Sequence, residues 1–497
     1  MMNMKKFTYL WIVVLFEVLP LSCSNFLEEF DQDKFVPNKA EHFAALMLRE
    51  FNYDPGLSVI FQFMTDEVAE TTSENIAPAE NRASLKPLYT WQKDIEVTEE
   101  GLLVSNNNRA WQYLYRRVAI MNYIIEEIEK AEGTPEAIAF AKGEAYFIRA
   151  YCYFLLTNLY AEPYESAEHA RITYGVPLRT DIGVSPTYDK NMLNECYNLI
   201  ESDLAEARRL IEQSGITNKS MYHPSVKACD LLMSTIKLYK KEYPEVIDAA
   251  TKVINGSSLM KLTGAMESGL FITTLNPEVL YSFSRLESTP NEAIFRNHAL
   301  VVSPGLYDSY HESDLRKKVY FYEAIFDYGD RIEVFVYPRK GQTSFSQMGL
   351  NNLRVAEAYL NRAEAYAFTN QHDNARADLR TLLAMRYLDA SNIQIPTDNA
   401  QLIAFIFQER FKELCFEVHH RWFDLRRMGP TWRPEIVRQF TIADRNGSVQ
   451  GVEFFTLLKN DRNYTLSVPK AEKENNPFIF DYERFDKMSE INETSTF

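Results

Sequence analysis

The chain has 497 residues, of which 25% are charged and 46% hydrophobic, so it can bury a large core without disulfides or bound metals. Its formal net charge of −16, together with the lack of any run dominated by lysine and arginine, excludes a typical nucleic-acid-binding protein. Aromatic residues make up 13% of the chain, enough to fill the core and leave some for binding surfaces.

The first 22 residues are predicted to be a secretory signal peptide. In MMNMKKFTYLWIVVLFEVLPLSC, two lysines precede an apolar run that is too short for a membrane-spanning helix and is interrupted by Glu17. The sequence LPLSC ends at Cys23 and resembles a bacterial lipobox, whose cysteine becomes the acylated first residue of the mature chain. Cys23 is therefore the predicted lipidation site. The alternative is an ordinary signal peptide followed by an incidental cysteine.

The four remaining cysteines are predicted to be buried free thiols. They are widely spaced, each lies in a helical pattern, and none forms a CxxC motif. These residues are Cys152, Cys196, Cys229 and Cys415.

Helical periodicity dominates the chain after about residue 40. Apolar residues at 3-4 spacing predict a helix within 106–133, with Asn108 as its N-cap, and a second helix that ends before Pro163. Residues 225–256 and 352–387 each predict two helices joined by a short turn, with Pro244 in the first turn of the helix it begins. Such pairs resemble tetratricopeptide units, so the predicted fold is a mostly helical scaffold of paired helices.

Three regions interrupt this helical pattern and are predicted to be long loops with a few short strands. They cover residues 66–101, 256–310 and 320–350. Binding residues usually lie on loops that a rigid scaffold holds in place.

The segment ERFKELCFEVHHRWFDLRRMG, residues 409–429, is predicted to be a packing helix that begins near Ile406. Its apolar residues fall on one face at steps of three and four: Phe407, Phe411, Leu414, Val418, Trp422 and Leu425. Glu417 with Arg421 and Asp424 with Arg427 are expected to form exposed ion pairs along this helix. The adjacent histidines His419 and His420 lack the spacing of a zinc site, so we expect no metal there.

The same segment resembles the signature helix of the SusD/RagB family. Further similarities follow in order along most of the mature chain: SNFLEEF after Cys23, AWQYLYRRVAIMNYII, GEAYFIRAYCYFLLTNLY, LRVAEAYLNRAEAYA and YTLSVPKAEKENNP. Each of these motifs is weak evidence by itself, whereas all of them in the right order are strong evidence.

Membership would imply an outer-membrane lipoprotein that faces the medium and acts with a SusC-like TonB-dependent transporter. Such a protein captures oligosaccharides or peptides for import, with no enzymatic activity and no cofactor. The resemblance divides the chain into a lipoprotein signal peptide (1–22), a SusD-like N-terminal region (23–220) and a RagB/SusD C-terminal region (221–497). Glu28, Glu29 and Asp31 resemble the acidic surface-export tags of such lipoproteins.

A sugar-binding site needs aromatic faces for the C–H surface of the ring and polar groups for the hydroxyls. Trp91 is the first candidate for such a face, because it lies in a polar loop, and core packing is the alternative for it. The full set of candidates is Tyr89, Trp91, Asp66, Glu67, Asn81, Tyr281, Arg285, Gln342, Ser344, Phe345 and Gln347.

Two other classes of function are less favoured by the sequence. Ser258–Lys261 and Ser467–Lys470 match the SxxK pattern of penicillin-binding proteins, but the accompanying SDN and KTG motifs are missing. A helical scaffold with no small ligand is the second alternative. The resemblance to the SusD/RagB family leaves two classes of ligand open, a glycan and a peptide.

Overall fold

The computed structural model describes residues 37–52, 62–71, 79–183, 188–217, 220–266, 268, 271–283, 292–340, 351–417, 419–444 and 448–491. The chain divides into two units, Met1–Asn38 and Lys39–Phe497.

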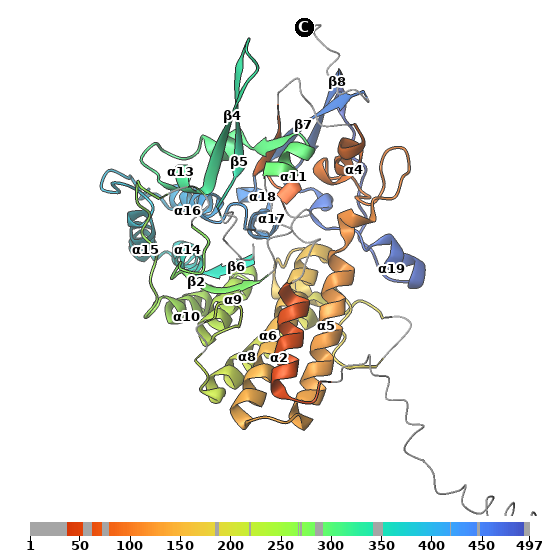
Figure 1. The fold of residues 1–497 in the computed structure, drawn as a ribbon, viewed down its shortest axis with the longest axis vertical. Helices are drawn as coiled ribbons and strands as arrows, with labels where there is room; N and C mark the ends of the chain where they lie inside the picture. The colour runs from red at the N-terminus through yellow and green to blue at the C-terminus, as the bar shows by residue number, and fades with distance from the viewer. Residues whose placement is uncertain are drawn as a thin grey trace, which may run out of the picture. The chain divides into compact units, whose positions relative to one another are not determined.

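A first group of helices is built around α6 (Pro135–Tyr160), which is buried over most of its length. It packs against α2 (Ala40–Asn52), α5 (Ala110–Glu127) and α8 (Leu193–Ser214) (Figure 1). Gly143 brings α6 and α8 close together, because a Cβ atom there would lie 2.9 Å from Ile211 and 3.1 Å from the carbonyl of Ala207. Helix α6 therefore forms the centre of this half of the core.

A second group consists of two helix pairs and one further helix. Helix α9 (Val226–Tyr239) turns at Lys241 into α10 (Tyr243–Ile254), and α14 (Val355–Phe368) turns at Asn370 into α15 (His372–Ala384). Lys241 and Asn370 have φ angles of 61° and 59°, the left-handed conformation that commonly ends a helix. Helix α14 also packs against α10 and against α16 (Asn399–Glu413).

The strands are short and pair antiparallel. β1 (Val68–Glu70) pairs with β3 (Leu300–Val302), and β2 (Val279–Phe283) pairs with β6 (Asn351–Arg354). β4 (Phe321–Asp327) and β5 (Ile332–Pro338) form a hairpin that extends from the body in Figure 1. β8 (Val449–Leu457) lies between β7 (Ile436–Ala443) and β9 (Glu490–Ile491).

Short helices connect these elements. They are α4 (Ala79–Tyr89), η1 (Ser105–Asn108), η2 (Ile128–Lys130), α7 (Ala167–Ile172), α11 (Glu292–Asn297), α12 (Pro304–Tyr307), α13 (Arg316–Tyr320), α17 (His420–Arg427), α18 (Gly429–Trp432), η4 (Arg462–Tyr464) and α19 (Lys470–Asn475). The mostly helical fold with paired helices is the one that the sequence predicts.

Several local predictions need correction. The N-cap of α5 is Arg109 and makes no side-chain capping bond, because Asn108 belongs to η1 and its amide donates elsewhere. The region 66–101, predicted to be a loop, contains β1 and helix α4.

The four cysteines beyond residue 100 are buried free thiols, as predicted. The domain boundary at residue 220 stays a prediction.

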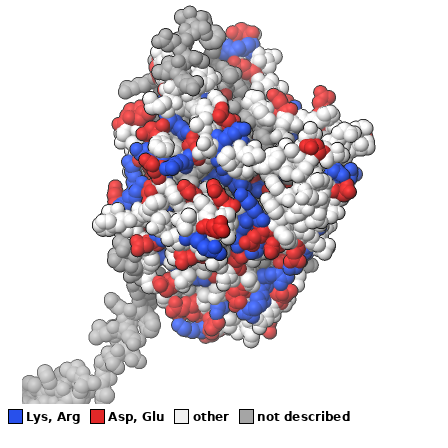
Figure 2. All heavy atoms as spheres, turned by 180° about the vertical axis from the view of Figure 1, so that it is seen from behind, with Lys and Arg blue, Asp and Glu red and all other residues white. Residues whose placement is uncertain are grey.

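The described part of the chain contains no helix that is both long and apolar enough to span a membrane. On the face shown in Figure 2, acidic and basic side chains are intermixed.

Candidate functional site

Three of the four aromatic residues predicted to bind ligand are buried in the core. Tyr89, Trp91 and Tyr281 are each 1% exposed. The indole Nε1 of Trp91 donates to the carbonyl of Met64 at 2.8 Å, and the guanidinium of Arg438 lies 4.5 Å from the centre of its ring. A buried ring offers no face to a sugar, so the predictions of aromatic platforms at Tyr89 and Trp91 and of a ligand contact at Tyr281 are wrong.

The predicted polar partners lie in different environments. The carboxylate of Asp66 accepts from Arg421 at 2.7 and 2.6 Å, while that of Glu67 is buried and accepts from the backbone amide of Phe416 at 2.9 Å. Burial raises the pKa of Glu67 to about 7, although the Phe416 amide opposes this shift. Glu67 therefore belongs to the core, and its prediction as a ligand contact is also wrong. Asn81 is exposed on α4.

The remaining predicted residues lie outside the described residues. They are Cys23, Arg285, Gln342, Ser344, Phe345 and Gln347.

The signature segment is broken into two helices instead of forming one. Helix α16 ends at Glu413 and α17 begins at His420, and Phe416 between them has a φ angle of 55°. The break lets the segment present its charged residues inward. The expected pair of Glu417 with Arg421 does not form, since Glu417 accepts from Arg354 and Arg421 donates to Asp66. Asp424 and Arg427 do pair, at 2.7 Å, but Asp424 is buried and Arg427 is partly buried, so the pair is not exposed.

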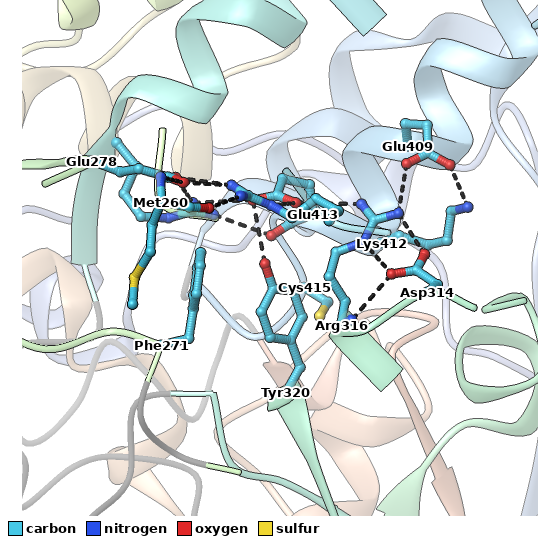
Figure 3. Close-up of polar contacts among 12 residues, drawn as sticks. Met260, Phe271, Glu278, Asp314, Arg316, Tyr320, Glu409, Lys412, Glu413 and Cys415 are labelled. Atoms are coloured by element: carbon cyan, nitrogen blue, oxygen red, sulfur yellow. Dashed lines mark hydrogen bonds and ion pairs between the residues drawn. The ribbon is translucent and has the colours of Figure 1, made fainter. Parts of the chain in front are cut away.

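The inward charges form a buried ion cluster that connects helices, strands and loops (Figure 3). Glu413 of α16 accepts from Arg386 at 2.9 Å, from Arg354 at 3.1 Å and from Arg316 at 3.3 Å. The ion cluster consists of five cations and five anions. The cations are Arg316, Lys340, Arg354, Arg386 and Lys412, and the anions are Glu278, Asp314, Glu409, Glu413 and Glu417. The equal numbers of cations and anions leave the cluster neutral.

The ion cluster has the properties of a scaffold. Burial alone would raise the pKa of Glu413. The guanidiniums of Arg386 and Arg354 outweigh burial and hold this pKa well below its usual range. Figure 3 shows the labelled acids and Arg316 directed toward one another, and Arg354 and Arg386 also donate to Glu413, so these hydrogen-bonding groups are used within the protein. Such a cluster fixes the relative positions of α13, α16 and β6 and offers no open group to a ligand.

The two histidines of the segment are buried and neutral. Their rings stack 4.6 Å apart, and burial lowers the pKa of His420 to about 3. Within the described ranges, no group of three or more His, Cys, Asp or Glu side chains is arranged to hold a metal ion.

A groove with a cavity volume of about 650 Å³ lies at the start of α5. We call it the aromatic groove. It is lined by Glu96, Ser105, Asn108, Arg109, Trp111, Gln112, Tyr113, Tyr115, Pro177, Arg179, Tyr188, Pro469, Ala471, Glu472 and Asn475. These residues come from distant parts of the chain: Glu96 with η1 and the start of α5, then Pro177, Arg179 and Tyr188, and finally the region of α19.

The aromatic side chains of the groove are held in place by a chain of contacts. Trp111 lies against Tyr115, with ring centres 4.9 Å apart, and its Nε1 donates to Glu472 at 3.2 Å. The hydroxyl of Tyr115 donates to the carbonyl of Pro177 at 2.7 Å. Tyr113 and Tyr188 are half-buried, so parts of both side chains face solvent.

Polar side chains line the same groove. Gln112 and Asn475 are exposed, and Arg109 is half-buried at the edge of the groove. The guanidinium of Arg179 lies 4.4 Å from the centre of the Tyr188 ring. Partly exposed aromatic rings beside hydrogen-bonding side chains are the surface that a sugar requires.

Sequence reasoning missed this groove for a physical reason. Helical periodicity assigned Trp111 and Tyr115 to a core stripe, which is correct for most of their surface. The groove exists because segments around residues 110, 180 and 472 meet in space, and no local pattern in the sequence records that meeting.

Two family profiles match the chain. A profile described as starch-binding and associating with the outer membrane matches residues 47–238, and a SusD family profile matches residues 319–494. The chain belongs to the SusD family. This assignment confirms the resemblance seen in the sequence, and it makes the chain a binding protein of an outer-membrane-associated family, not an enzyme.

Solved structures of SusD proteins share the fold. A SusD-like carbohydrate binding protein from Bacteroides vulgatus matches with a TM-score of 0.68 and 18% identity, covering 89% of this chain and 98% of its own. A SusD superfamily protein from Bacteroides thetaiotaomicron matches with a TM-score of 0.66 and 19% identity, and the match covers 90% of this chain and 100% of that protein. A SusD superfamily protein from Bacteroides fragilis matches with a TM-score of 0.62 and 20% identity, and the match covers 88% of this chain and 98% of that protein. A search of curated proteins found no match.

Proposed function

We propose that this SusD-family protein is a lipid-anchored protein of the outer-membrane surface that captures oligosaccharides. It passes them to a partner SusC-like TonB-dependent transporter for import. The lipid is attached at Cys23, after removal of residues 1–22. The observation that carries the proposal is the aromatic groove, in which half-buried tyrosines lie beside exposed amides and two arginines.

The groove suits an oligosaccharide in both size and chemistry. Its volume of about 650 Å³ is in the range of small-molecule sites. Tyr113 and Tyr188 supply aromatic surface for the C–H faces of sugar rings, and Gln112 and Asn475 supply donors and acceptors for hydroxyl groups. Its walls are pre-formed by the contacts of Trp111 and Tyr115, so little conformational entropy is lost when a sugar binds.

Residues outside the groove remain part of the proposal. Asn81 stays a proposed ligand-binding residue, as do Arg285, Gln342, Ser344, Phe345 and Gln347, which lie outside the described ranges. Asp66 is a weaker member of this set, because Arg421 already pairs with it.

A peptide ligand is the second candidate within the same architecture. A peptide would depend mainly on backbone hydrogen bonds along the groove and less on the aromatic rings. The concentration of tyrosines in the groove favours the glycan.

The experiment is binding of the soluble chain, starting at Ser24, to panels of glycans and peptides. We expect a glycan to bind, and Tyr113→Ala and Tyr188→Ala each to weaken it by about tenfold through loss of ring contacts. Tyr328→Ala is the matched control, because Tyr328 is an exposed tyrosine in the turn between β4 and β5. Binding of peptides alone would contradict the proposal, as would equal losses in all three variants.

A further inference from the structure

The aromatic groove contains an arginine whose charge is not neutralised by the described residues. Arg109 is half-buried at the groove, and its side chain forms no ion pair or hydrogen bond with any residue in the described ranges. Several other partly or fully buried arginines are paired with carboxylates: Arg149 with Asp203, Arg208 with Asp230, Arg362 with Asp378 and Arg427 with Glu364. The buried Arg426, Arg433 and Arg438 donate to backbone carbonyls instead, and Arg109 has neither kind of partner among the described residues. Desolvating a cation without a partner is unfavourable, so an unpaired arginine here indicates a ligand anion.

A second arginine in the groove keeps donors available. The guanidinium of Arg179 is positioned by the Tyr188 ring, 4.4 Å away, and donates to the carbonyl of Gly183 at 3.2 Å. A guanidinium carries five N–H donors, and the described residues supply no carboxylate to Arg179. Its planar fork matches the two oxygens of a carboxylate.

The direction of helix α5 also favours a negatively charged ligand in the groove. Helix α5 has 18 residues, begins at Ala110 in the wall of the groove, and has no side-chain cap at its N-terminus. The N-terminal end of a helix carries a partial positive charge that favours anions. Together with Arg109 and Arg179, it makes this part of an otherwise acidic chain attractive to a negative charge.

The two carboxylates of the groove are already used by protein donors. Glu96 accepts from the backbone amide of Lys470 at 2.9 Å and from the amide of Asn108 at 3.3 Å, and burial raises its pKa. Glu472 accepts from the indole of Trp111 at 3.2 Å. Neither pairs with Arg109 or Arg179, so both guanidiniums stay available to a ligand.

From this arrangement we infer that the groove is specific for acidic oligosaccharides that carry uronic-acid carboxylates. Arg109 and Arg179 bind the carboxylate, while Tyr113 and Tyr188 contact the sugar rings. This inference rests on the proposed function, because it names the class of glycan that the groove takes.

The test compares each acidic glycan with its own neutral counterpart. Oligosaccharides of galacturonate, alginate and hyaluronan are titrated into the soluble chain beside the same oligosaccharides with their carboxyl groups reduced to alcohols. We expect at least one acidic form to bind at least about tenfold more tightly than its reduced form, since a charge-assisted hydrogen bond is lost on reduction. Binding of the acidic form should also weaken as salt is raised.

Three variants locate the effect. Arg109→Gln and Arg179→Gln should each weaken the acidic form by about ten- to a hundredfold and change the reduced form much less. Glu472→Gln should tighten the acidic form, because it removes a negative charge from the groove while its side chain can still accept from Trp111. Lys252→Gln is the control, since Lys252 is an exposed cation on α10 outside the groove, and it should leave affinity unchanged.

The outcomes separate this inference from the proposed function. Equal binding of acidic and reduced forms, or full affinity in both arginine variants, would overturn the acidic specificity and leave glycan capture standing. Failure of every glycan, acidic and neutral, would overturn both. Thermal melting of each variant shows whether a lost affinity comes from unfolding.

Discussion

The guanidinium of Arg438 lies 4.2 Å from the ring centre of Tyr89 and 4.5 Å from that of Trp91. It also donates to the backbone carbonyls of Phe63, Thr65 and Tyr89. Arg438 therefore joins two segments that are distant in sequence, and the two aromatic rings cover its buried charge. Burial lowers the pKa of Arg438 to about 10.

Trp91→Ala should destabilise the protein by about 3–5 kcal/mol, because it leaves a cavity and removes the bond to Met64. Urea denaturation of wild type and variant measures the loss, with Trp91→Phe as a milder control that keeps an aromatic ring. A variant of unchanged stability that had lost its ligand would restore Trp91 as a binding residue.

Glu67 should make stability depend on pH in a defined direction. Its pKa is about 7 in the folded protein and 4.5 in the unfolded chain, so both states are protonated below about pH 4.5. Between these values the unfolded chain releases its proton first, and the folded state loses about 3 kcal/mol of relative stability as pH rises. Above about pH 7 the loss is complete.

Glu67→Gln isolates this effect, since glutamine has nearly the same shape and no charge. The free energy of unfolding of wild type, minus that of the variant, should fall as pH rises from about 4.5 to about 7 and then level off. A difference that is constant with pH, or that rises, would show that Glu67 is ionised in the folded protein.

At the scale of elements, the break between α16 and α17 decides what the signature segment does. Glu409 and Glu413 lie in α16 before the turn at Phe416, and Glu417 lies directly after it, and all three side chains belong to the buried ion cluster. The apolar spacing alone did not predict the break, because it continues through the turn and the left-handed residue is a phenylalanine, not a glycine. The prediction that the segment serves packing holds, but ion pairs are a large part of that packing.

Glu413→Gln should cost about 3–5 kcal/mol, because it leaves three guanidiniums with too little negative charge in a buried site. Denaturant unfolding measures this cost. Asp248→Asn is the matched control, because it breaks the exposed pair of Asp248 with Lys252 and should have little effect on stability. Comparable effects of the two substitutions would mean that the cluster does not stabilise the fold.

At the scale of the whole molecule, the sequence was a good guide to the fold and a poor guide to the site. The periodicity of residues 106–160, 225–256 and 352–387 predicted the helix pairs, because amphipathic stripes record burial directly. Trp91 and Tyr89 misled the site prediction, because a polar neighbourhood in sequence does not show what packs above a ring in space. Arg109 and Tyr188 carry no local signal, since their partners in the groove come from other segments.

The anchor can be tested on the whole chain in its native host. Cys23→Ala should abolish lipid attachment and lower the share of the protein in the outer-membrane fraction, because the acyl chain at Cys23 is the proposed membrane anchor. Cell fractionation, with labelling by a radioactive fatty acid, measures both effects. Labelling of the variant by fatty acid to the same extent as wild type would contradict lipidation at this residue.

The most direct test of the central claim is a crystal structure of the soluble chain with its tightest-binding oligosaccharide. We predict that the sugar lies in the aromatic groove, in contact with Tyr113 and Tyr188 and with an acidic group at Arg109. A sugar bound elsewhere on the chain, with an empty groove, would contradict the account.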